Sequence, residues 1–542
     1  MKRTKIIYAL LLACASITLP GCSDLTPVDY SEINPSNFPK TESDIQSLVL
    51  SCYFPLRGSW WDGIFSTSER GVMFLNDATT GILTGTFGEQ KMCSQLNYFP
   101  ESTGITWFYY TRSKDYAEGY SQKISRCTLV LDAIANSTLD NTTKQRYEAE
   151  VRCTLVMDQI ENSSLREELK EKYMAEVRCA RAFLSYILYD MYGPLVVAPL
   201  EVLKNPLEEK PLPRLSRAEM AKFIEDDLLF AGQHLPLPAN TEYGRFSRGL
   251  AKMLLIRLYL HETADYNYPE GLTHGDKSNY DKVVTLAREL KDPQYGYALQ
   301  SDYNAMFARG GQGKDNKEII FALPCSYEGP SLNQWHMMVL PTDYAGHGMG
   351  SGWGTVTSTW YFYDSFESGD VRRQGLLTSY TTSGGTTVDR NTPSSPLAAG
   401  PIPLKIGYDP GVKGSGGYTD IDIVLFRYAD VYLSLAEGLC QKQGATTADL
   451  HEAIDNVNVV RNRAGLPSLS YANYTQAEDV LNAILKERWH EFWCENGQYR
   501  SDMIRYHRLV PLGRAINQSP YAADYKELYP LPLEVITDGK GQ

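Results

Sequence analysis

Three carboxylates recur at helical spacing near the end of the chain. Glu487, Glu491 and Glu495 lie four residues apart, which places them on one face of a helix. Glycosidases use a pair of neighbouring carboxyl groups to cleave the glycosidic bond. Carboxylates this close also raise one another's pKa unless cations lie between them. The three glutamates therefore serve either in catalysis or in an internal ion network.

Several arginines are placed to neutralise these glutamates, which favours the ion network. They are Arg488, Arg500 and Arg505, nearby in sequence, and Arg427, Arg461 and Arg463, which could reach the glutamates in the folded chain. We therefore interpret Glu487 and Glu491 as structural and predict that the protein is not an enzyme. A glycoside hydrolase that uses Glu487 or Glu491 is the alternative.

Other catalytic and cofactor motifs find little support. The histidines form no His-Glu-x-x-His and no pair at helical metal-ligand spacing, so we predict no metal. Gly350-Ser351-Gly352 lacks the first glycine of a nucleophile elbow. The stretch from Gly411 to Gly417 does not place a lysine where a phosphate loop needs one. We predict no cofactor.

Aromatic side chains mixed with polar ones offer a different chemistry, the capture of sugars. A flat ring packs against the apolar face of a pyranose, while amide, carboxylate and guanidinium groups bind its hydroxyls. The chain has 37 Tyr, 17 Phe and 8 Trp. Two regions combine such residues: Trp60, Trp61, Arg70, Asn76, Asp77, Trp107, Tyr109 and Tyr110, and later Asn333, Gln334, Trp335, Trp353 and Trp360.

From these two regions we predict one ligand-binding cluster on the basis of loop placement and aromatic-polar mixing. Its members are Asp77, Trp107, Tyr109, Trp335 and Trp353. Packing in the interior is the alternative for each of them. Trp360 is a weaker candidate, because Thr359 to Phe366 looks helical and half-buried.

The first residues indicate where the protein resides. Lys2, Arg3 and Lys5 precede a short apolar run, and Leu19-Pro20-Gly21-Cys22 ends the segment. This pattern predicts a cleaved signal peptide over 1–21 and a lipidated Cys22 that tethers the mature protein to a membrane surface. An ordinary secretory signal with an incidental Cys22 is the alternative.

Charge and cysteine usage narrow the possible partners. Loss of the signal removes three positive charges and no negative ones, which takes the net charge from −13 to −16. So acidic a surface repels phosphate backbones, and we predict no nucleic-acid partner. The cysteines form no Cys-x-x-Cys pair and are widely spaced, which favours buried core residues over a disulfide framework or a zinc site.

A tandem duplication stands in the first half of the chain. The segments 126–151 and 152–177 agree at fifteen of twenty-six positions. Their apolar residues recur at helical spacing, and Asn-Ser interrupts the pattern at Asn136 and Asn162. We interpret the duplication as an added helical hairpin.

Longer repeats of paired helices resemble tetratricopeptide units. One runs from Arg427 to Pro467, and another begins at Ser247 and resumes at Tyr280 after an insertion. The segment from Ser216 to Leu235 is a further predicted helix, with Ser216 and Glu219 placed as a capping box. Between Tyr295 and Gly417 the helical periodicity fades, and we predict a loop-rich, ligand-facing part with short strands near Glu318 to Leu323.

Three segments resemble the SusD/RagB family of outer-membrane nutrient-binding lipoproteins. Ala175 to Val196 is similar to the family's A-E-x-R-x-x-R-A-F and Y-G-D-x-P-L-V, with Pro194 where Asp is frequent. Tyr363 to Arg372 is similar to Y-D-x-F-E-x-x-D-x-R. The third spans Arg427-Tyr428-Ala429-Asp430, Arg461 to Pro467, Glu487 to Phe492, Asp502 to Arg505 and Leu528 to Pro532. The duplication is not part of the family pattern.

The resemblance implies a mainly α protein of the SusD-like fold, a tetratricopeptide-like scaffold whose variable loops bind ligand. It implies one domain over 22–542, with helical repeats in about 22–290, a loop-rich part in about 295–417 and a helical part in about 420–535. It also implies a surface-exposed, lipid-anchored protein of the outer membrane. Such a protein binds oligosaccharides without cleaving them and delivers them to a TonB-dependent transporter of the SusC type.

Three alternatives remain at this point. One is a peptide-binding member of the same family. The second is a lipid-anchored glycoside hydrolase. The third is a scaffold whose helical repeats bind only protein.

Overall fold

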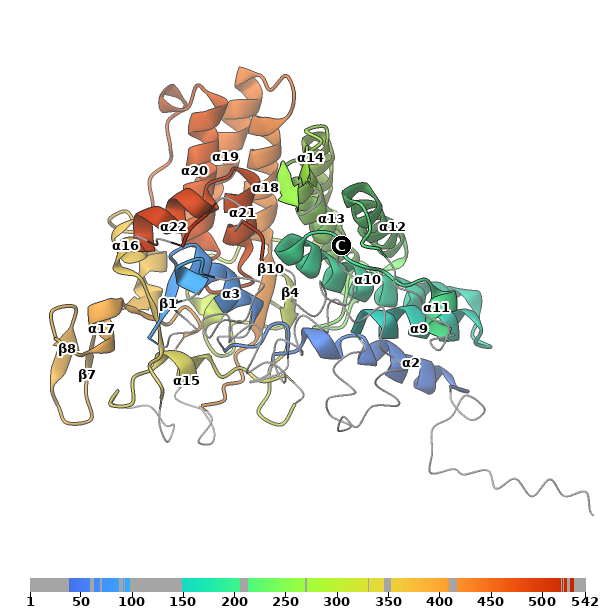
Figure 1. Ribbon diagram of the computed structural model, residues 1–542, viewed down its shortest axis with the longest axis horizontal. Helices are drawn as coiled ribbons and strands as arrows, with labels where there is room; N and C mark the ends of the chain where they lie inside the picture. The colour runs from blue at the N-terminus through green and yellow to red at the C-terminus, as the bar shows by residue number, and fades with distance from the viewer. Residues whose placement is uncertain are drawn as a thin grey trace, which may run out of the picture.

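The structure is a computed structural model (Figure 1). It describes residues 39–58, 63–68, 71–86, 91, 93–97, 149–204, 213–268, 271–329, 331–345, 352–407, 409, 417–517, 519, 521–523 and 527–530. The predicted signal peptide, Cys22, Trp107 and Tyr109 lie outside the described residues. So does the first copy of the duplication up to residue 148.

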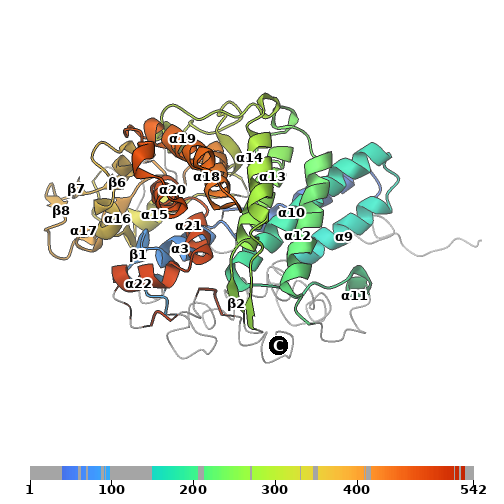
Figure 2. The same cartoon turned by 90° about the horizontal axis from the view of Figure 1, so that it is seen from above.

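A series of antiparallel helices forms the scaffold, as the sequence predicts. In chain order they are α9 (Ala149–Glu161), α10 (Glu167–Tyr192), α12 (Arg217–His234), α13 (Arg248–Glu262), α14 (Asn279–Leu290), α18 (Tyr428–Gln441), α19 (Thr447–Arg463) and α20 (Ala477–Glu491). Each packs on the next, and Figure 2 shows the row from α9 and α10 at one end to α19 and α20 at the other. Such stacking buries a continuous seam between helix pairs.

Local signals set the ends of these helices. Ser216 caps α12, and Glu219 bonds back to the Ser216 backbone, which confirms the predicted capping box. Ser247 caps α13. A small residue also occupies the crossing of α14 and α18. A Cβ on Gly438 of α18 would lie 2.9 Å from Val284 Cγ2 and 3.2 Å from the backbone carbonyl oxygen of Tyr280, both in α14.

The second copy of the duplication forms a helical hairpin. Its residues build α9 and the first part of α10, and the chain turns between them after Asn162. Cys153, Val156 and Ile160 of α9 are buried. The predicted hairpin is therefore confirmed for this copy.

Short elements and loops make up the part between α14 and α18. The helical ones are η6 (Pro293–Tyr295), η7 (Ala305–Phe307), α15 (Trp335–Val339), α16 (Trp360–Asp364), η8 (Val371–Gly375) and α17 (Pro396–Ala399). The strands are β4 (Ile319–Leu323), β5 (Val356–Ser358), β6 (Leu376–Leu377), β7 (Ser379–Thr381), β8 (Thr387–Asp389) and β9 (Ile402–Pro403). β4 and α16 confirm the predictions for Glu318 to Leu323 and for Thr359 to Phe366.

All strand pairs of the described residues are antiparallel and two-stranded. β4 pairs with β10 (Ile423–Arg427), β1 (Leu83–Gly85) with β5, β2 (Tyr266–Tyr268) with β3 (Gly271–Thr273), β6 with β9 and β7 with β8. β10 ends where α18 begins. The β4–β10 pair therefore joins the loop-rich part directly to the helical repeats.

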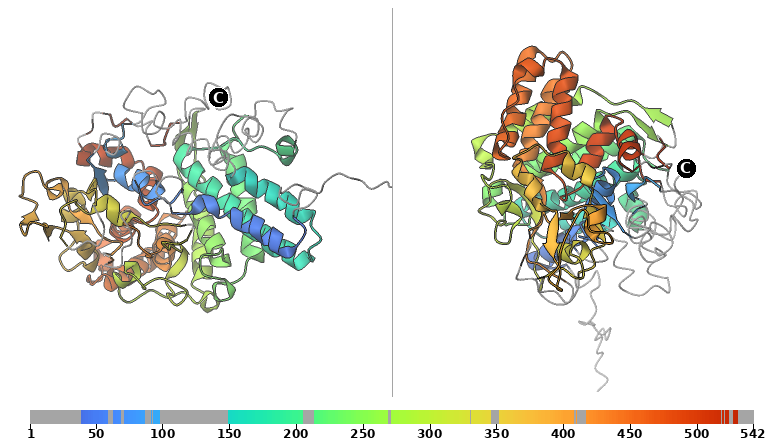
Figure 3. Two further views of the ribbon diagram at one scale, coloured as in Figure 1. Left: turned by 90° about the horizontal axis from the view of Figure 1, so that it is seen from below. Right: turned by 90° about the vertical axis from the view of Figure 1, so that its left-hand side faces the viewer.

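The remaining elements lie before α9, between the helices of the scaffold and after α20. They are α2 (Glu42–Ser51), η1 (Phe54–Leu56), α3 (Val72–Thr79), α11 (Leu200–Lys204), η5 (Pro238–Asn240), η9 (Tyr471–Asn473), α21 (Gln498–Arg505) and α22 (Leu509–Asn517). α2 packs on α9 and α10, and α3 packs on α21. Seen from below, the loop-rich part, yellow to orange, lies beside the teal and green helices (Figure 3, left).

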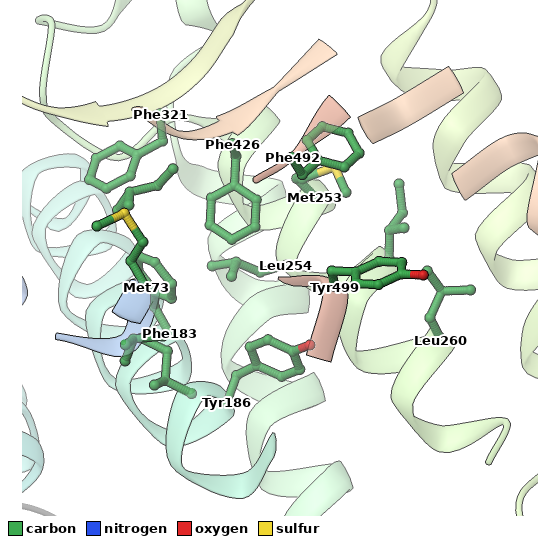
Figure 4. Close-up of a cluster of buried hydrophobic side chains, with 14 of the residues drawn as sticks. Met73, Phe183, Tyr186, Met253, Leu254, Leu260, Phe321, Phe426, Phe492 and Tyr499 are labelled. Carbon is green, nitrogen blue, oxygen red and sulfur yellow. The ribbon is translucent and has the colours of Figure 1, made fainter. Parts of the chain in front are cut away.

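One apolar cluster reaches from the helices into the loop-rich part. Phe183 of α10 lies with its ring centroid 6.1 Å from that of Phe321 in β4 and 5.6 Å from that of Phe426 in β10 (Figure 4). Met73 of α3 and Met253 of α13 belong to the same cluster. Both parts thus share a core.

The described cysteines confirm their predicted role as small core residues. Cys52, Cys93, Cys153, Cys179, Cys325, Cys440 and Cys494 are free thiols and buried. Within the described ranges, every helix is too short or too polar to cross a bilayer.

Candidate functional site

Loops around α15 carry exposed aromatic rings. We define the α15 loops as residues 325–329, 331–345, 352–354 and 417–422. α15 lies at the lower side of the molecule in Figure 1, away from the labels of α19 and α20. An antiparallel bridge between Asn333 and Thr419 joins two of these segments, and Asn333 Nδ2 donates to the Ile421 oxygen at 2.8 Å.

Two tyrosines form the first aromatic group of the α15 loops. Tyr327 is 44% exposed. Its ring centroid lies 5.5 Å from that of the half-buried Tyr418, with the ring planes at 57°. The backbone N–H of Tyr327 donates to Asp420 Oδ1 at 3.1 Å. This bond ties the segment of Tyr327 to the segment of Tyr418, and Tyr327 is accessible from solvent.

Trp353 is the second aromatic group. It is 40% exposed, and its backbone N–H donates to the Met337 oxygen of α15 at 2.7 Å. A Cβ on the preceding Gly352 would lie 2.1 Å from the Leu340 oxygen, so only glycine fits there. Gly354 adopts φ +57°, a conformation that favours glycine. The two glycines therefore allow the Trp353 backbone to lie close to the end of α15.

Carboxylates and one arginine accompany these rings. Arg309 Nη1 lies 3.3 Å from Asp409 Oδ1, and Arg309 Nη2 lies 3.1 Å from Asp420 Oδ2. The buried Asp409 also accepts a 2.6 Å bond from the Thr419 hydroxyl. Hydroxyl-binding groups therefore stand beside flat apolar faces, which is the mixture that sugar recognition needs.

The structure separates the predicted ligand-binding residues. Trp353 is exposed, whereas Trp335 is fully buried and donates from Nε1 to the Pro403 oxygen at 2.8 Å. Asp77 is also fully buried, and Asp77 Oδ2 accepts the Cys494 N–H at 2.7 Å. Asp77 and Trp335 therefore present no surface to a ligand here, because tertiary packing encloses them. The five-residue cluster as a whole stays a prediction.

Sequence reasoning missed Tyr327 and Tyr418. Both are single tyrosines among 37, and 90 residues separate them in the chain. Their position next to glycine-rich loops is a weak signal. Trp360 lies half-buried on α16, and its Nε1 donates to the Leu397 oxygen at 2.9 Å.

The three glutamates on and after α20 form a buried ion network. Arg372 contacts Glu487 at 2.5 Å and Glu491 at 3.0 Å. Arg427 contacts Glu491 at 2.7 Å and Glu495 at 2.8 Å. Arg461 pairs with Glu487, Arg463 with Glu491 and Lys405 with Glu495. All three carboxylates are buried, which confirms the predicted network and leaves none of them accessible to a substrate.

The electrostatics of this network agree with a structural role. Burial alone raises the pKa of Glu491, but Arg463, Arg427 and Arg372 outweigh it and hold the pKa far below its usual value. Burial lowers the pKa of Lys405 to about 8, against the attraction of Glu495. A general acid would instead need a pKa near the working pH, so Glu491 is poorly suited to that task.

The arginine assignments need one correction. Arg427, Arg461 and Arg463 reach the glutamates as predicted, but Arg488 and Arg505 belong to a second buried cluster. Arg488 contacts Asp430 at 2.7 Å and Asp502 at 2.6 Å, and Arg505 contacts Asp502 at 2.8 Å. Arg500 lies over the Tyr529 ring at 4.4 Å. Arg488 thus pairs with aspartates of α18 and α21 and not with the glutamates of the first network.

Comparison with known sequences gives one family. The SusD family model matches residues 400–533. The SusD-like protein P2 of Formosa agariphila is 24% identical over 507 residues, which cover 90% of this chain and 88% of that protein. The starch-binding protein SusD of Bacteroides thetaiotaomicron is 29% identical over 131 residues, 23% of this chain and 21% of that protein.

Solved structures share the fold. A SusD superfamily protein from Parabacteroides distasonis has a TM-score of 0.68 and 20% identity, over 93% of this chain and 99% of that one. A laminarin-binding SusD-like protein has the same score, identity and coverage. Surface glycan-binding protein A from Bacteroides thetaiotaomicron, solved with laminarihexaose, has a TM-score of 0.66 and 18% identity, over 93% of this chain and 98% of that one.

Proposed function

Because the chain belongs to the SusD/RagB family, we propose that it binds oligosaccharides at the cell surface and passes them to a TonB-dependent outer-membrane transporter of the SusC type. Acyl chains on Cys22 anchor it in the outer membrane. It binds its ligand without cleaving it. The names of relatives that bind starch and laminarin support glycans as the ligand class.

The exposed aromatic groups of the α15 loops carry this proposal. Tyr327 and Trp353 are exposed, and Tyr327 lies against the half-buried Tyr418, next to Asp420 and its partner Arg309. Exposed rings next to fixed hydrogen-bonding groups suit a ligand that is half apolar and half polar. Oligosaccharides are such ligands. The loops that hold these rings are braced by α15 and by the Asn333–Thr419 bridge, so the site is largely formed before ligand arrives.

The burial of Glu487 and Glu491 supports binding without hydrolysis. Their carboxylates are enclosed and paired with arginines. A glycosidase needs two carboxyl groups that flank the scissile bond. A hydrolase that uses Glu487 or Glu491 would therefore have to open the buried network around α20.

Retention on immobilised glycans tests the binding site. We expect the mature protein to bind at least one polymer of a panel that includes laminarin and starch. The double variant Tyr327→Ala/Trp353→Ala should bind it about tenfold to one-hundredfold more weakly, from loss of one or two ring contacts of about 1.4 kcal/mol each. Tyr471→Ala, which removes a similarly exposed tyrosine on η9, is the matched control and should bind as the parent does.

Three results would contradict the proposal. Retention on peptides and on no glycan would favour the peptide-binding alternative. Tight binding to a transporter with no affinity for any glycan or peptide would favour a protein scaffold. Release of reducing ends from a bound polymer would show hydrolysis.

Replacement of Cys22 by Ala tests the lipid anchor separately. The variant should no longer be found in the membrane fraction of the cells that express it.

A further inference from the structure

Acidic side chains surround the exposed tyrosines of the α15 loops. Glu328 follows Tyr327 and is exposed. The Asp420 side chain is 32% exposed and accepts the Tyr327 N–H. Asp422 is half-buried and accepts bonds from the Tyr243 hydroxyl and the Cys325 N–H at 2.7 and 2.9 Å. A ligand that approaches the tyrosine pair therefore meets several carboxylates.

The described residues of the α15 loops carry little positive charge. The α15 loops contain neither lysine nor arginine over the residues that define them. His336 is buried, and burial lowers its pKa, so it is uncharged at neutral pH. Arg309 lies two residues after the end of η7. Its guanidinium nitrogens lie 3.3 Å from the Asp409 carboxylate and 3.1 Å from the Asp420 carboxylate. Its charge is already neutralised by two fixed partners.

Two exposed lysines of the loop-rich part line a separate cleft. Lys314 and Lys317 are exposed and line a cleft of about 150 Å³ together with Tyr243 and Tyr297. No residue of the α15 loops, within the ranges described, lines that cleft. The lysines therefore do not offset the carboxylates next to Tyr327 and Tyr418 by direct contact.

We propose that the α15 loops select uncharged glycans and reject glycans that carry carboxylate or sulfate groups. This inference rests on the proposed function of the same loops. Among the described residues of these loops, a ligand anion would approach Asp420 and Glu328 with no lysine or arginine to bind, and repulsion between like charges weakens the binding of the charged ligand. The net charge, −13 for the whole sequence and −16 without residues 1–21, adds to the repulsion at longer range.

Matched polymers test the selection. We would compare laminarin or soluble starch, whichever the protein retains, with its carboxymethyl derivative and with its hydroxyethyl derivative, which adds similar bulk and no charge. In about 0.1 M salt we expect the carboxymethyl polymer to bind at least tenfold more weakly than the hydroxyethyl polymer. In 1 M salt the screening length falls from about 10 to about 3 Å, and the ratio should fall below threefold.

A charge-removing substitution assigns the effect to the site. Asp420→Asn keeps an acceptor for the Tyr327 N–H and frees Arg309 from one partner. It should raise the affinity for the carboxymethyl polymer, relative to the affinity for the hydroxyethyl polymer, at least fivefold, whatever it does to the binding of the uncharged polymer itself. Asp364→Asn is the control. It removes the same charge from Asp364 of α16, which forms an exposed ion pair with Arg390, and it should not change the binding of either polymer.

The outcomes separate this inference from the proposed function. Equal or tighter binding of the carboxymethyl polymer in low salt would overturn the inference and leave glycan binding intact. Equal effects of Asp420→Asn and Asp364→Asn would also overturn it, because total charge and not the loop carboxylates would then set the preference. Failure of the parent protein to retain any glycan would refute the proposed function itself.

Discussion

At the scale of single residues, burial decides which aromatic side chains can meet a ligand. Trp335 and Trp353 are similar in sequence context, since both lie in loops rich in polar and small residues. The first is enclosed and bonded to Pro403, while the second projects from two glycines into solvent. No local pattern distinguishes them, because the enclosing atoms of Trp335 come from residues distant in the chain.

Asp77 leads to a prediction about pH. Burial raises its pKa to about 7, although the Cys494 N–H opposes the rise, and Lys405 and Glu495 act on it with opposite signs. An unfolded Asp titrates near 3.9, so the folded state holds a proton between about pH 4 and 7 that the unfolded state lacks. The fold therefore loses stability as the pH rises through about 7.

Asp77→Asn should remove this loss. At pH 8 we expect it to raise the unfolding free energy by about 2–4 kcal/mol, from about 1.36 kcal/mol per unit of pKa shift. Below pH 4 the two proteins should have similar stability, and urea unfolding at several pH values measures the difference. An equal gain at every pH would show that the titration of Asp77 is not the cause. Asp364→Asn, at the surface, should change stability by less than about 0.5 kcal/mol.

At the scale of elements, the helical repeats follow from sequence far better than the loops do. Capping residues, apolar spacing and small residues at crossings are local signals, and they predicted α12, α13, α14, α18 and α19. The spacing of the three glutamates predicted one helical face, which Glu487 and Glu491 share, but α20 ends at Glu491 and Glu495 lies beyond it. Two of their partners, Arg372 and Lys405, come from the loop-rich part, about which helical periodicity says nothing. The pairing of Tyr327 with Tyr418 depends on a bridge between distant segments and left no periodic trace.

Two glycines in helices make a matched test of the crossing between α14 and α18. A Cβ on Gly438 would lie 2.9 Å from Val284 Cγ2, whereas one on Gly232 of α12 meets nothing within 4 Å. Gly438→Val should lower the unfolding free energy by about 1–3 kcal/mol through overpacking. Gly232→Ala should raise it by about 0.5–1 kcal/mol through better helix propensity. Thermal or urea unfolding measures both, and a neutral Gly438→Val would mean that the crossing is loosely packed.

At the scale of the whole molecule, the shared core makes the predicted single domain testable. Phe426 lies in β10, which pairs with β4 of the loop-rich part, and it packs on Phe183 of α10, so its side chain lies between the loop-rich part and the helical repeats. Phe426→Ala should lower the unfolding free energy by about 3–5 kcal/mol. Leu229→Ala, at an exposed position of α12, should cost little.

Two probes decide whether the parts unfold together. Helix content by far-ultraviolet circular dichroism and burial of tryptophan by fluorescence should change at the same urea concentration in both the parent protein and Phe426→Ala. Two separate transitions would show that the loop-rich part and the repeats are independent domains.

The unbroken passage from β10 into α18 has a mechanical consequence. Phe426 sits in the shared core, Arg427 is clamped by Glu318, Glu491 and Glu495, and the helix begins at the next residue. The chain therefore has no flexible linker at this junction. The loop-rich part, held there by β4 and β10, cannot tilt unless the helical repeats tilt with it. If the chain lies over a transporter, as we propose, a gating motion would then move both parts as one rigid body.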